Sequence, residues 1–345
     1  MIKRNAVYVL WCAKKRILEA YTCEKNLEVV SNIIDKVYHC IHNRRRVKHE
    51  RNKPLIFFKK HYKQKYVNLT ANYPTFENAH AILFCILFMT KRTVPIIVGN
   101  WKSTPKTLDE GIKFIKQLEK KVVKLKTKIP KKGYYLAVPE IFIPALEELA
   151  VHGYIGAETV PGTVFGQVTG ATIPSQLASA GANFVIVGHS EVRARGETKE
   201  ERSEKVLQSL SAKLTTIMCV GEHKRDKEGK YLEELENDVK QILSSVKREL
   251  FPRLIIAYEP VWAIGGTSPA TSGECFEAVI AIRRALASLA GIDYAKKVHI
   301  LYGGTVMEDN AKTFLEEGGV DGLLIGRASQ EVTSFMGILT ELYTH

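Results

Sequence analysis

The sequence predicts an α/β protein in which eight parallel strands close into a (β/α)8 barrel, preceded by a basic, non-globular extension. From Val94 onward, eight short apolar runs alternate with amphipathic segments. Such alternation indicates parallel strands joined by helical crossovers, and eight units close into a barrel. An open, doubly wound sheet is the alternative. That fold would be expected to have a glycine-rich dinucleotide turn after its first strand, and Gly99-Asn100-Trp101-Lys102 is not one.

The expected strands are short runs rich in branched, aliphatic and aromatic residues. They cover residues 96–98, 134–138, 154–157, 184–187, 214–220, 254–258, 298–302 and 322–325. The expected helices carry apolar residues at i, i+3 and i+4 spacing. The clearest of them cover residues 108–123, 197–210, 231–250 and 275–289.

Residues 1–93 differ in composition from the predicted barrel, residues 94–345. They hold 19 Lys and Arg against 6 Asp and Glu, so the whole net charge of +13 lies in this extension. Its Met-Ile-Lys-Arg start, a short apolar stretch and a long acid-poor segment resemble a bipartite organelle presequence. That resemblance implies a plastid, apicoplast-like location. The alternatives are an untargeted or spurious extension on a cytosolic protein, with Met89 as a natural start, and an interaction domain.

Charge and cysteine content exclude several classes of protein. The basic pI of about 9.3 is typical of nucleic-acid binding, but the neutral barrel region argues against it. Cys219 and Cys275 are isolated and form no CxxC pair, so neither a disulfide framework nor a metal site is expected. The longest apolar run, residues 81–89, is about half of what spans a bilayer, so no stable membrane insertion is expected.

One strand end carries the clearest chemistry. Glu259 directly follows the apolar run 254–258 and precedes a loop, residues 260–270, with Pro260 at its start and Gly265-Gly266 in its middle. Barrel enzymes place their sites at the C-terminal ends of the strands. A carboxylate there, shielded from water by a closing loop, is suited to act as a general base.

Three other strand ends carry Gly99-Asn100-Trp101-Lys102, Gly188-His189-Ser190-Glu191 and Tyr302-Gly303-Gly304-Thr305. Together with the Glu259 segment, these motifs in this order and spacing closely resemble the triosephosphate isomerase family. The resemblance runs from about Val94 to the C-terminus and implies a TIM barrel without metal or organic cofactor.

The resemblance also implies the role of each residue. Glu259 would be the base that removes a proton from a carbon next to a carbonyl. His189 would be a neutral imidazole that donates to the substrate carbonyl, at the N-terminus of a short helix beginning near Ser190. Ser190 would help to position the base.

The first strand would supply the positive charge. Lys102 would stabilise the phosphate dianion and the developing enediolate. Asn100 would hydrogen-bond a substrate oxygen, and on an extended segment both side chains would point the same way. Glu191 would form an ion pair with Lys102.

The phosphate would be held mainly by backbone N–H groups after the last two strands. Gly304, Thr305 and Gly326 are the candidates there, and Gly265 would add a donor when the loop closes. Arg327 stands where the family usually has a second glycine. In having this arginine, the sequence resembles the tetrulose-phosphate isomerases, which use the same barrel. Arg327 would either reach the phosphate or point outward from the first helical turn, and we favour the outward pose.

The resemblance thus implies an isomerase that interconverts D-glyceraldehyde 3-phosphate and dihydroxyacetone phosphate in glycolysis and gluconeogenesis. The alternatives are a tetrulose-phosphate isomerase and a non-catalytic phosphate-binding barrel. The resemblance implies a homodimer, and the apolar loop 160–172 supports it. Ala171 and Val192 replace the Glu and Arg that pair across the family's dimer interface, so we expect an altered interface.

Overall fold

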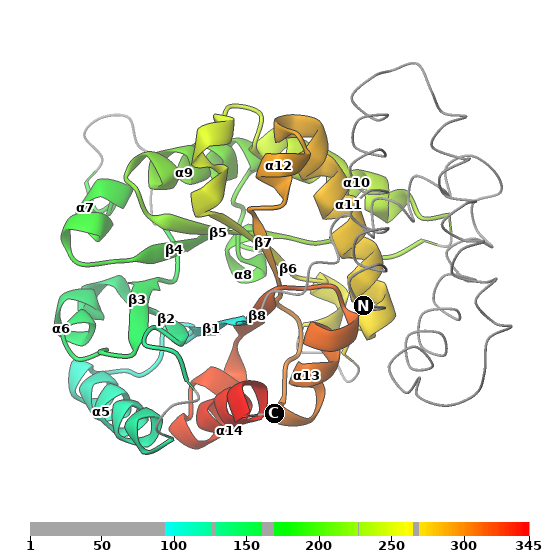
Figure 1. Cartoon of the computed structure of the whole chain (residues 1–345). Coiled ribbons are helices and arrows are strands. Elements are labelled where there is room, and N and C mark those ends of the chain that lie inside the picture. Colours follow the sequence, from blue (N-terminus) through cyan, green and yellow to red (C-terminus); the bar gives the residue numbers. More distant parts are fainter. Residues whose placement is uncertain (1–93, 126–128, 161–168, 227, 265–268, 345) are drawn as a thin grey trace, which may run out of the picture. The chain divides into compact units, whose positions relative to one another are not determined.

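The computed structural model describes residues 94–125, 129–160, 169–226, 228–264 and 269–344. The predicted presequence therefore lies outside the described residues, as do Gly265 and most of the loop expected at the dimer interface. Within the described part, the strands form one closed barrel in which each strand pairs in parallel with the next and β8 pairs with β1 (Figure 1). The predicted (β/α)8 barrel is confirmed.

The eight strands agree with the expected runs to within two residues at either end. They are β1 (Ile96–Asn100), β2 (Tyr134–Val138), β3 (Gly153–Ala157), β4 (Phe184–Val187), β5 (Thr215–Val220), β6 (Leu254–Tyr258), β7 (His299–Tyr302) and β8 (Gly322–Ile325). β1 is longer than predicted, and Asn100 is its last residue.

The longer helices lie around the outside of the barrel (Figure 1). The α-helices are α5 (Leu108–Lys124), α6 (Ile143–Glu147), α7 (Pro174–Ser179), α8 (Ser190–Arg193), α9 (Lys199–Ser211), α10 (Lys230–Ile242), α11 (Ser272–Ala290), α12 (Ile292–Ala295), α13 (Glu308–Glu317) and α14 (Val332–Thr344). The 3-10 turns are η2 (Glu140–Phe142), η3 (Arg248–Arg253), η4 (Val261–Ala263) and η5 (Arg327–Ser329).

Local sequence explains where the long helices begin and end. A Thr N-cap followed three residues later by Glu forms a capping box at the starts of α5, α9 and α11. The predicted helix 231–250 was wrong at its end, because α10 stops at Ile242. Ser244 Oγ there donates to the Gln241 carbonyl at 2.8 Å, a local bond that competes with helix continuation.

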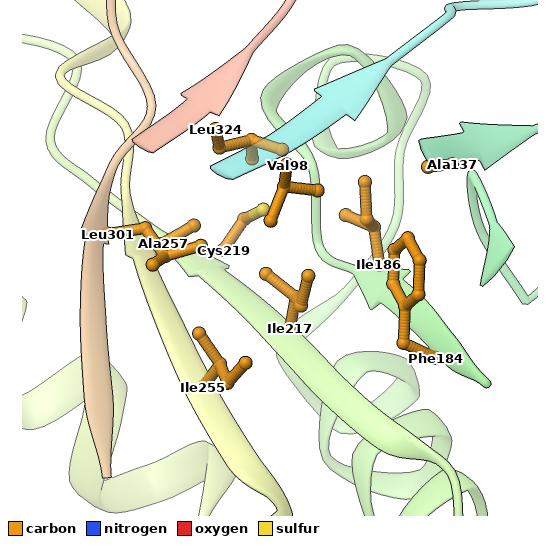
Figure 2. Close-up of a cluster of buried hydrophobic side chains, with 10 residues drawn as sticks. All are labelled: Val98, Ala137, Phe184, Ile186, Ile217, Cys219, Ile255, Ala257, Leu301 and Leu324. Atoms are coloured by element: carbon orange, nitrogen blue, oxygen red, sulfur yellow. The ribbon is translucent and has the colours of Figure 1, made fainter. Parts of the chain in front are cut away.

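The inside of the barrel is an apolar core built from alternate strand residues (Figure 2). Its members are Val98, Ala137, Phe184, Ile186, Ile217, Cys219, Ile255, Ala257, Leu301 and Leu324, none more than 4% exposed. Because side chains alternate along a strand, the residue two positions after the last core residue also faces inward, and it lies at the barrel mouth. This rule places Asn100 after Val98 and Glu259 after Ala257 at the C-terminal end of the core.

Candidate functional site

Glu259 follows β6 at the barrel mouth and is 1% exposed. Its Oε2 accepts the Ser190 N–H at 2.9 Å, and its Oε1 lies 3.3 Å from His189 Nε2. Gly303 leaves room for it, because a Cβ added at that position would lie 2.9 Å from Glu259 Cγ. The carboxylate is thus buried between the loop after β4 and the end of β7.

His189 is the N-cap of α8, the short helix that the sequence predicts from Ser190. Its Nδ1 accepts the Glu191 N–H at 3.2 Å. A neutral imidazole that accepts through Nδ1 carries its proton on Nε2. This bond therefore fixes the tautomer that presents an N–H donor at the mouth, beside the Glu259 carboxylate.

Lys102 Nζ donates to Glu191 Oε1 at 2.7 Å, which confirms the expected ion pair. Burial by itself would raise the pKa of Glu191, but the hydrogen bond and charge of Lys102 outweigh it and lower the pKa. The same ammonium lies beside Gly326, where an added Cβ would be 3.5 Å from Nζ. The structure therefore brings the Lys102 charge to the end of β8, where the phosphate is expected.

The backbone around Lys102 contradicts the expectation of an extended segment. Lys102 and Ser103 both adopt positive φ, 54° and 59°, so the chain turns sharply after β1. Asn100 Oδ1 accepts the Lys102 N–H at 3.2 Å within this turn. Strand alternation therefore does not set the direction of Lys102; a turn closed by the Asn100 side chain does.

The remaining expected phosphate residues lie at the ends of β7 and β8, which pair with each other. Gly304 and Thr305 follow β7, and Gly326 follows β8. Thr305 Oγ1 donates to the Ala263 carbonyl at 2.9 Å, so it holds the first turn of the loop after β6. Arg327 begins η5 and is exposed.

Two residues beside Glu259 were missed by the sequence interpretation. Cys219 in β5 is fully buried; burial, and then the negative charge of Glu259, to which it hydrogen-bonds, raise its thiol pKa well above the ordinary value. Arg193 Nη1 donates to the Gly221 carbonyl at 3.0 Å, and Arg193 Nη2 lies 3.9 Å from Glu259 Oε2. Cys219 could have been found from the sequence. It lies near the end of β5, on the inward face, where strand alternation points it toward the mouth.

A second missed group anchors the start of the loop after β6. Glu222 Oε1 accepts hydrogen bonds from Tyr258 OH, Trp262 Nε1 and Arg225 Nε, each at 2.9 Å. The Arg225 guanidinium also lies 5.3 Å from the centre of the Trp262 ring. The predicted barrel makes β5 and β6 neighbours, but no residue pattern shows that the Glu222 side chain turns toward Tyr258 and Trp262.

Two features of the described residues bear on metal binding and on membrane insertion. No group of three or more His, Cys, Asp or Glu side chains in this part of the chain is arranged to hold a metal ion. Within the same residues, no helix combines the length and the apolar character needed to cross a membrane.

The arrangement suits proton transfer at carbon. A buried carboxylate, an imidazole N–H and an ammonium converge at one mouth, so a base, a hydrogen-bond donor and a fixed positive charge are available together. The site residues come from β1, β4, β6, β7 and β8, and only the closed barrel brings these strand ends together.

Comparison with known proteins agrees with this geometry. A family model described as triosephosphate isomerase matches residues 95–342. Proteins named triosephosphate isomerase from Thermoanaerobacter pseudethanolicus and Porphyromonas gingivalis are 35% and 38% identical over 250 and 248 residues. Those alignments each cover 71% of this chain, and 98% and 97% of the respective relatives. One from Bacteroides fragilis is 36% identical over 247 residues, which are 71% of this chain and 97% of the relative. The matches and the residues at the strand ends together show that this chain belongs to the triosephosphate isomerase family.

Proposed function

We propose that this chain is a triosephosphate isomerase that interconverts D-glyceraldehyde 3-phosphate and dihydroxyacetone phosphate, a reaction of glycolysis and gluconeogenesis. The observation that carries the proposal is the pairing of the buried Glu259 carboxylate with His189 Nε2, 3.3 Å apart, at the mouth that also holds Lys102. Family membership supports the same reaction.

Proton transfer would follow from this geometry. Glu259 takes a proton from the carbon next to the substrate carbonyl, and the electron pair left behind forms an enediol(ate). His189 Nε2–H donates to the carbonyl oxygen as negative charge develops on it. A proton then passes from the neighbouring hydroxyl to that oxygen by way of His189 Nε2. Glu259 returns its own proton to the former carbonyl carbon, which leaves the carbonyl on the adjacent carbon. No cofactor is required, because the carbonyl itself acidifies the neighbouring C–H bond.

The phosphate would lie between Lys102 and the ends of β7 and β8. Backbone N–H groups near Gly304 and Gly326 are suited to an anion, since glycine allows close approach. Lys102 adds a full positive charge on the same side, beside Gly326. Glu191 holds that ammonium in place before substrate binds.

Arg327 is the residue that bears on the choice of sugar. Its exposure at the start of η5 supports the outward pose, in which it does not bind substrate. We therefore favour a three-carbon substrate over a tetrulose phosphate. The complete set of Asn100, Lys102, His189 and Glu259 argues against a barrel that has lost its chemistry.

Steady-state assays on both sugar phosphates, combined with Glu259→Asp, test the function. The parent should show higher kcat/KM on dihydroxyacetone phosphate than on a tetrulose phosphate. Glu259→Asp withdraws the base by about 1 Å, so turnover should fall about a hundredfold while glycerol phosphate still binds. Near-normal turnover in this variant would show that Glu259 is not the base.

We further propose that the protein is a homodimer. Ile141 in η2 is 77% exposed, and its neighbour Glu140 accepts a hydrogen bond from Thr172 at 2.9 Å. An exposed apolar side chain beside the loop expected at the interface would be covered by a second copy. Ala171 and Val192 supply no charge there, so the interface would be mainly apolar.

We propose a plastid location, carried by the basic extension alone. Residues 1–93 fused to a fluorescent protein should direct it to the plastid of a host that has one. Diffuse cytosolic fluorescence would favour the cytosolic alternative.

A further inference from the structure

The turn after β1 places two consecutive non-glycine residues in the left-handed region. Lys102 has φ 54° and Ser103 has φ 59°. Such residues are strained and persist only where their surroundings hold them. Two side chains accept the backbone N–H groups of this turn. Asn100 Oδ1 takes that of Lys102 at 3.2 Å.

The second acceptor is Glu158, which follows β3. Both of its carboxylate oxygens accept the Ser103 N–H, at 2.9 and 3.0 Å, and its Oε2 lies 3.5 Å from Ser103 Oγ. β3 pairs with β2, which pairs with β1, so the barrel itself brings this carboxylate to the Lys102 turn. Glu158 thus holds in place the residue that carries the catalytic ammonium.

We infer that Glu158 is a positioning residue for Lys102 and that its ionisation weakens binding of the dianionic substrate. The inference rests on the proposed function and adds to it a control of substrate affinity by pH. Glu158 acts through the backbone of Ser103, because the hydrogen bonds that join it to this turn end on Ser103.

Glu158 changes its charge near neutrality. Burial raises its pKa to about 7, although the hydrogen bonds from Ser103 act in the opposite direction. The negative charge of Glu191, on α8, raises it further. Glu191 is itself bonded to Lys102. In the described part of the chain, the turn thus links the carboxylates of Glu158 and Glu191 to the Lys102 ammonium, and the charge of Arg195 also acts on Glu191.

The sign of the effect follows from this arrangement. Below pH 7 Glu158 is mostly protonated and adds no charge beside Lys102. Above pH 7 it is a second carboxylate, after Glu191, beside the turn that carries Lys102, and it repels an incoming phosphate dianion. KM should therefore rise as pH passes through about 7, and kcat should change little because the turn keeps its hydrogen bonds.

Glu158→Gln separates charge from position in the full-length enzyme. The amide oxygen still accepts the Ser103 N–H but carries no charge. One unit above pH 7, its KM should be about threefold to tenfold lower than that of the parent, with similar kcat. One unit below, the two KM values should agree. Competitive inhibition by glycerol phosphate should show the same difference.

Glu158→Ala removes the acceptor as well as the charge. Its kcat should fall about tenfold or more, since Lys102 loses the support of its turn. Glu110→Gln is the matched control: Glu110 lies on α5, after the same turn, and accepts the N–H groups of Lys106 and Thr107. Gln preserves such a capping box, so this variant removes one nearby charge and should leave the KM profile unchanged.

Each outcome decides a separate point. If the parent lacks activity on triose phosphates, the proposed function is wrong, and this inference, which rests on it, is wrong as well. If the parent is active and Glu158→Gln has the parent's pH dependence of KM, the ionisation of Glu158 has no role. If Glu158→Ala keeps the parent's kcat, Glu158 does not position Lys102.

Discussion

At the scale of single residues, the site depends on which strand positions lack a side chain. Gly303 comes two residues after the inward-facing Leu301, so a larger residue there would point into the mouth. The atom that it would meet is Glu259 Cγ, at 2.9 Å. Contacts this close are avoided by real Cβ atoms, so either Glu259 or the end of β7 would have to move.

Gly303→Ala should therefore damage catalysis more than folding. A shift of the base by about 1 Å costs roughly a hundredfold in turnover, and the thermal midpoint should change little because the loss is local. Steady-state kinetics and thermal unfolding measure the two effects. Gly273→Ala is the control, because its added Cβ would meet only Thr271 Oγ1 at 3.9 Å on α11. Full activity of Gly303→Ala would mean that Glu259 tolerates displacement.

At the scale of helices and strands, α9 supports the loop that carries His189. Arg202 on α9 is 5% exposed, and its guanidinium donates to both carboxylate oxygens of Asp238 on α10, at 2.9 and 3.1 Å. Its side chain also fills the space beside Gly188, where an added Cβ would lie 2.9 Å from Arg202 Cδ. The residue before His189 is thus packed on a buried ion pair between two outer helices.

Asp238→Asn should destabilise the protein by about 3 kcal/mol at neutral pH, because it leaves the buried Arg202 charge without its partner. Burial raises the pKa of Asp238, but the hydrogen bond and charge of Arg202, with those of Lys199, outweigh it and lower the pKa overall. This stabilisation is present above the ordinary carboxyl pKa and is lost as pH falls through the lowered value. The difference in the free energy of unfolding between parent and variant should therefore become smaller at acidic pH.

Denaturant unfolding at a series of pH values measures that difference. Lys240→Ala provides the comparison, since Lys240 is 37% exposed and its i,i+4 partner Glu236, 3.6 Å away, keeps Arg284 as a second partner. Loss of the Lys240–Glu236 pair should change the free energy of unfolding by less than about 0.5 kcal/mol. Equal effects of the two variants would show that the Arg202–Asp238 pair contributes no more than a surface pair.

The sequence predicted what depends on periodicity and order along the chain. The alternating apolar runs predicted the eight strands and the closed barrel. The positions of Glu259 and His189 directly after such runs marked them as candidate site residues. The sequence did not predict what depends on contacts between distant segments. The left-handed turn at Lys102 was not predicted, because it is held by Glu158, which follows β3, as well as by Asn100. The hydrogen bonds of Glu222 to residues of β6 and η4 were missed for the same reason.

At the scale of the whole molecule, the catalytic chemistry and the net charge lie in different parts of the sequence. Residues 94–345 hold 31 basic and 31 acidic residues, and the barrel closes on itself within them. A truncated chain beginning at Met89 should therefore be soluble, folded and as active as the full chain. Activity per mole and circular dichroism of the two chains check this. Insolubility that residues 1–88 rescue would instead indicate an interaction domain.

The proposed dimer should depend little on salt. Exposed charge pairs weaken as ionic strength rises, whereas apolar contacts do not. Because Ala171 and Val192 carry no charge, sedimentation at low and at high salt should give the same dimer dissociation constant. A fully active monomer at low concentration would remove the dimer proposal, and a steep salt dependence would show that other charges hold the interface.

The glycines at the mouth constrain how this barrel can diverge. Gly221, Gly303 and Gly326 each follow an inward core residue by two positions, and the space beside them is occupied by Glu259 or Lys102. A side chain at Gly221 would meet the Glu259 backbone, one at Gly303 the Glu259 side chain, and one at Gly326 the flexible end of Lys102. Substitutions here would therefore disturb a catalytic residue as well as the room for substrate. Descendants of this chain that acquire a longer sugar phosphate should keep these strand ends unchanged and differ in the lengths of the connecting loops.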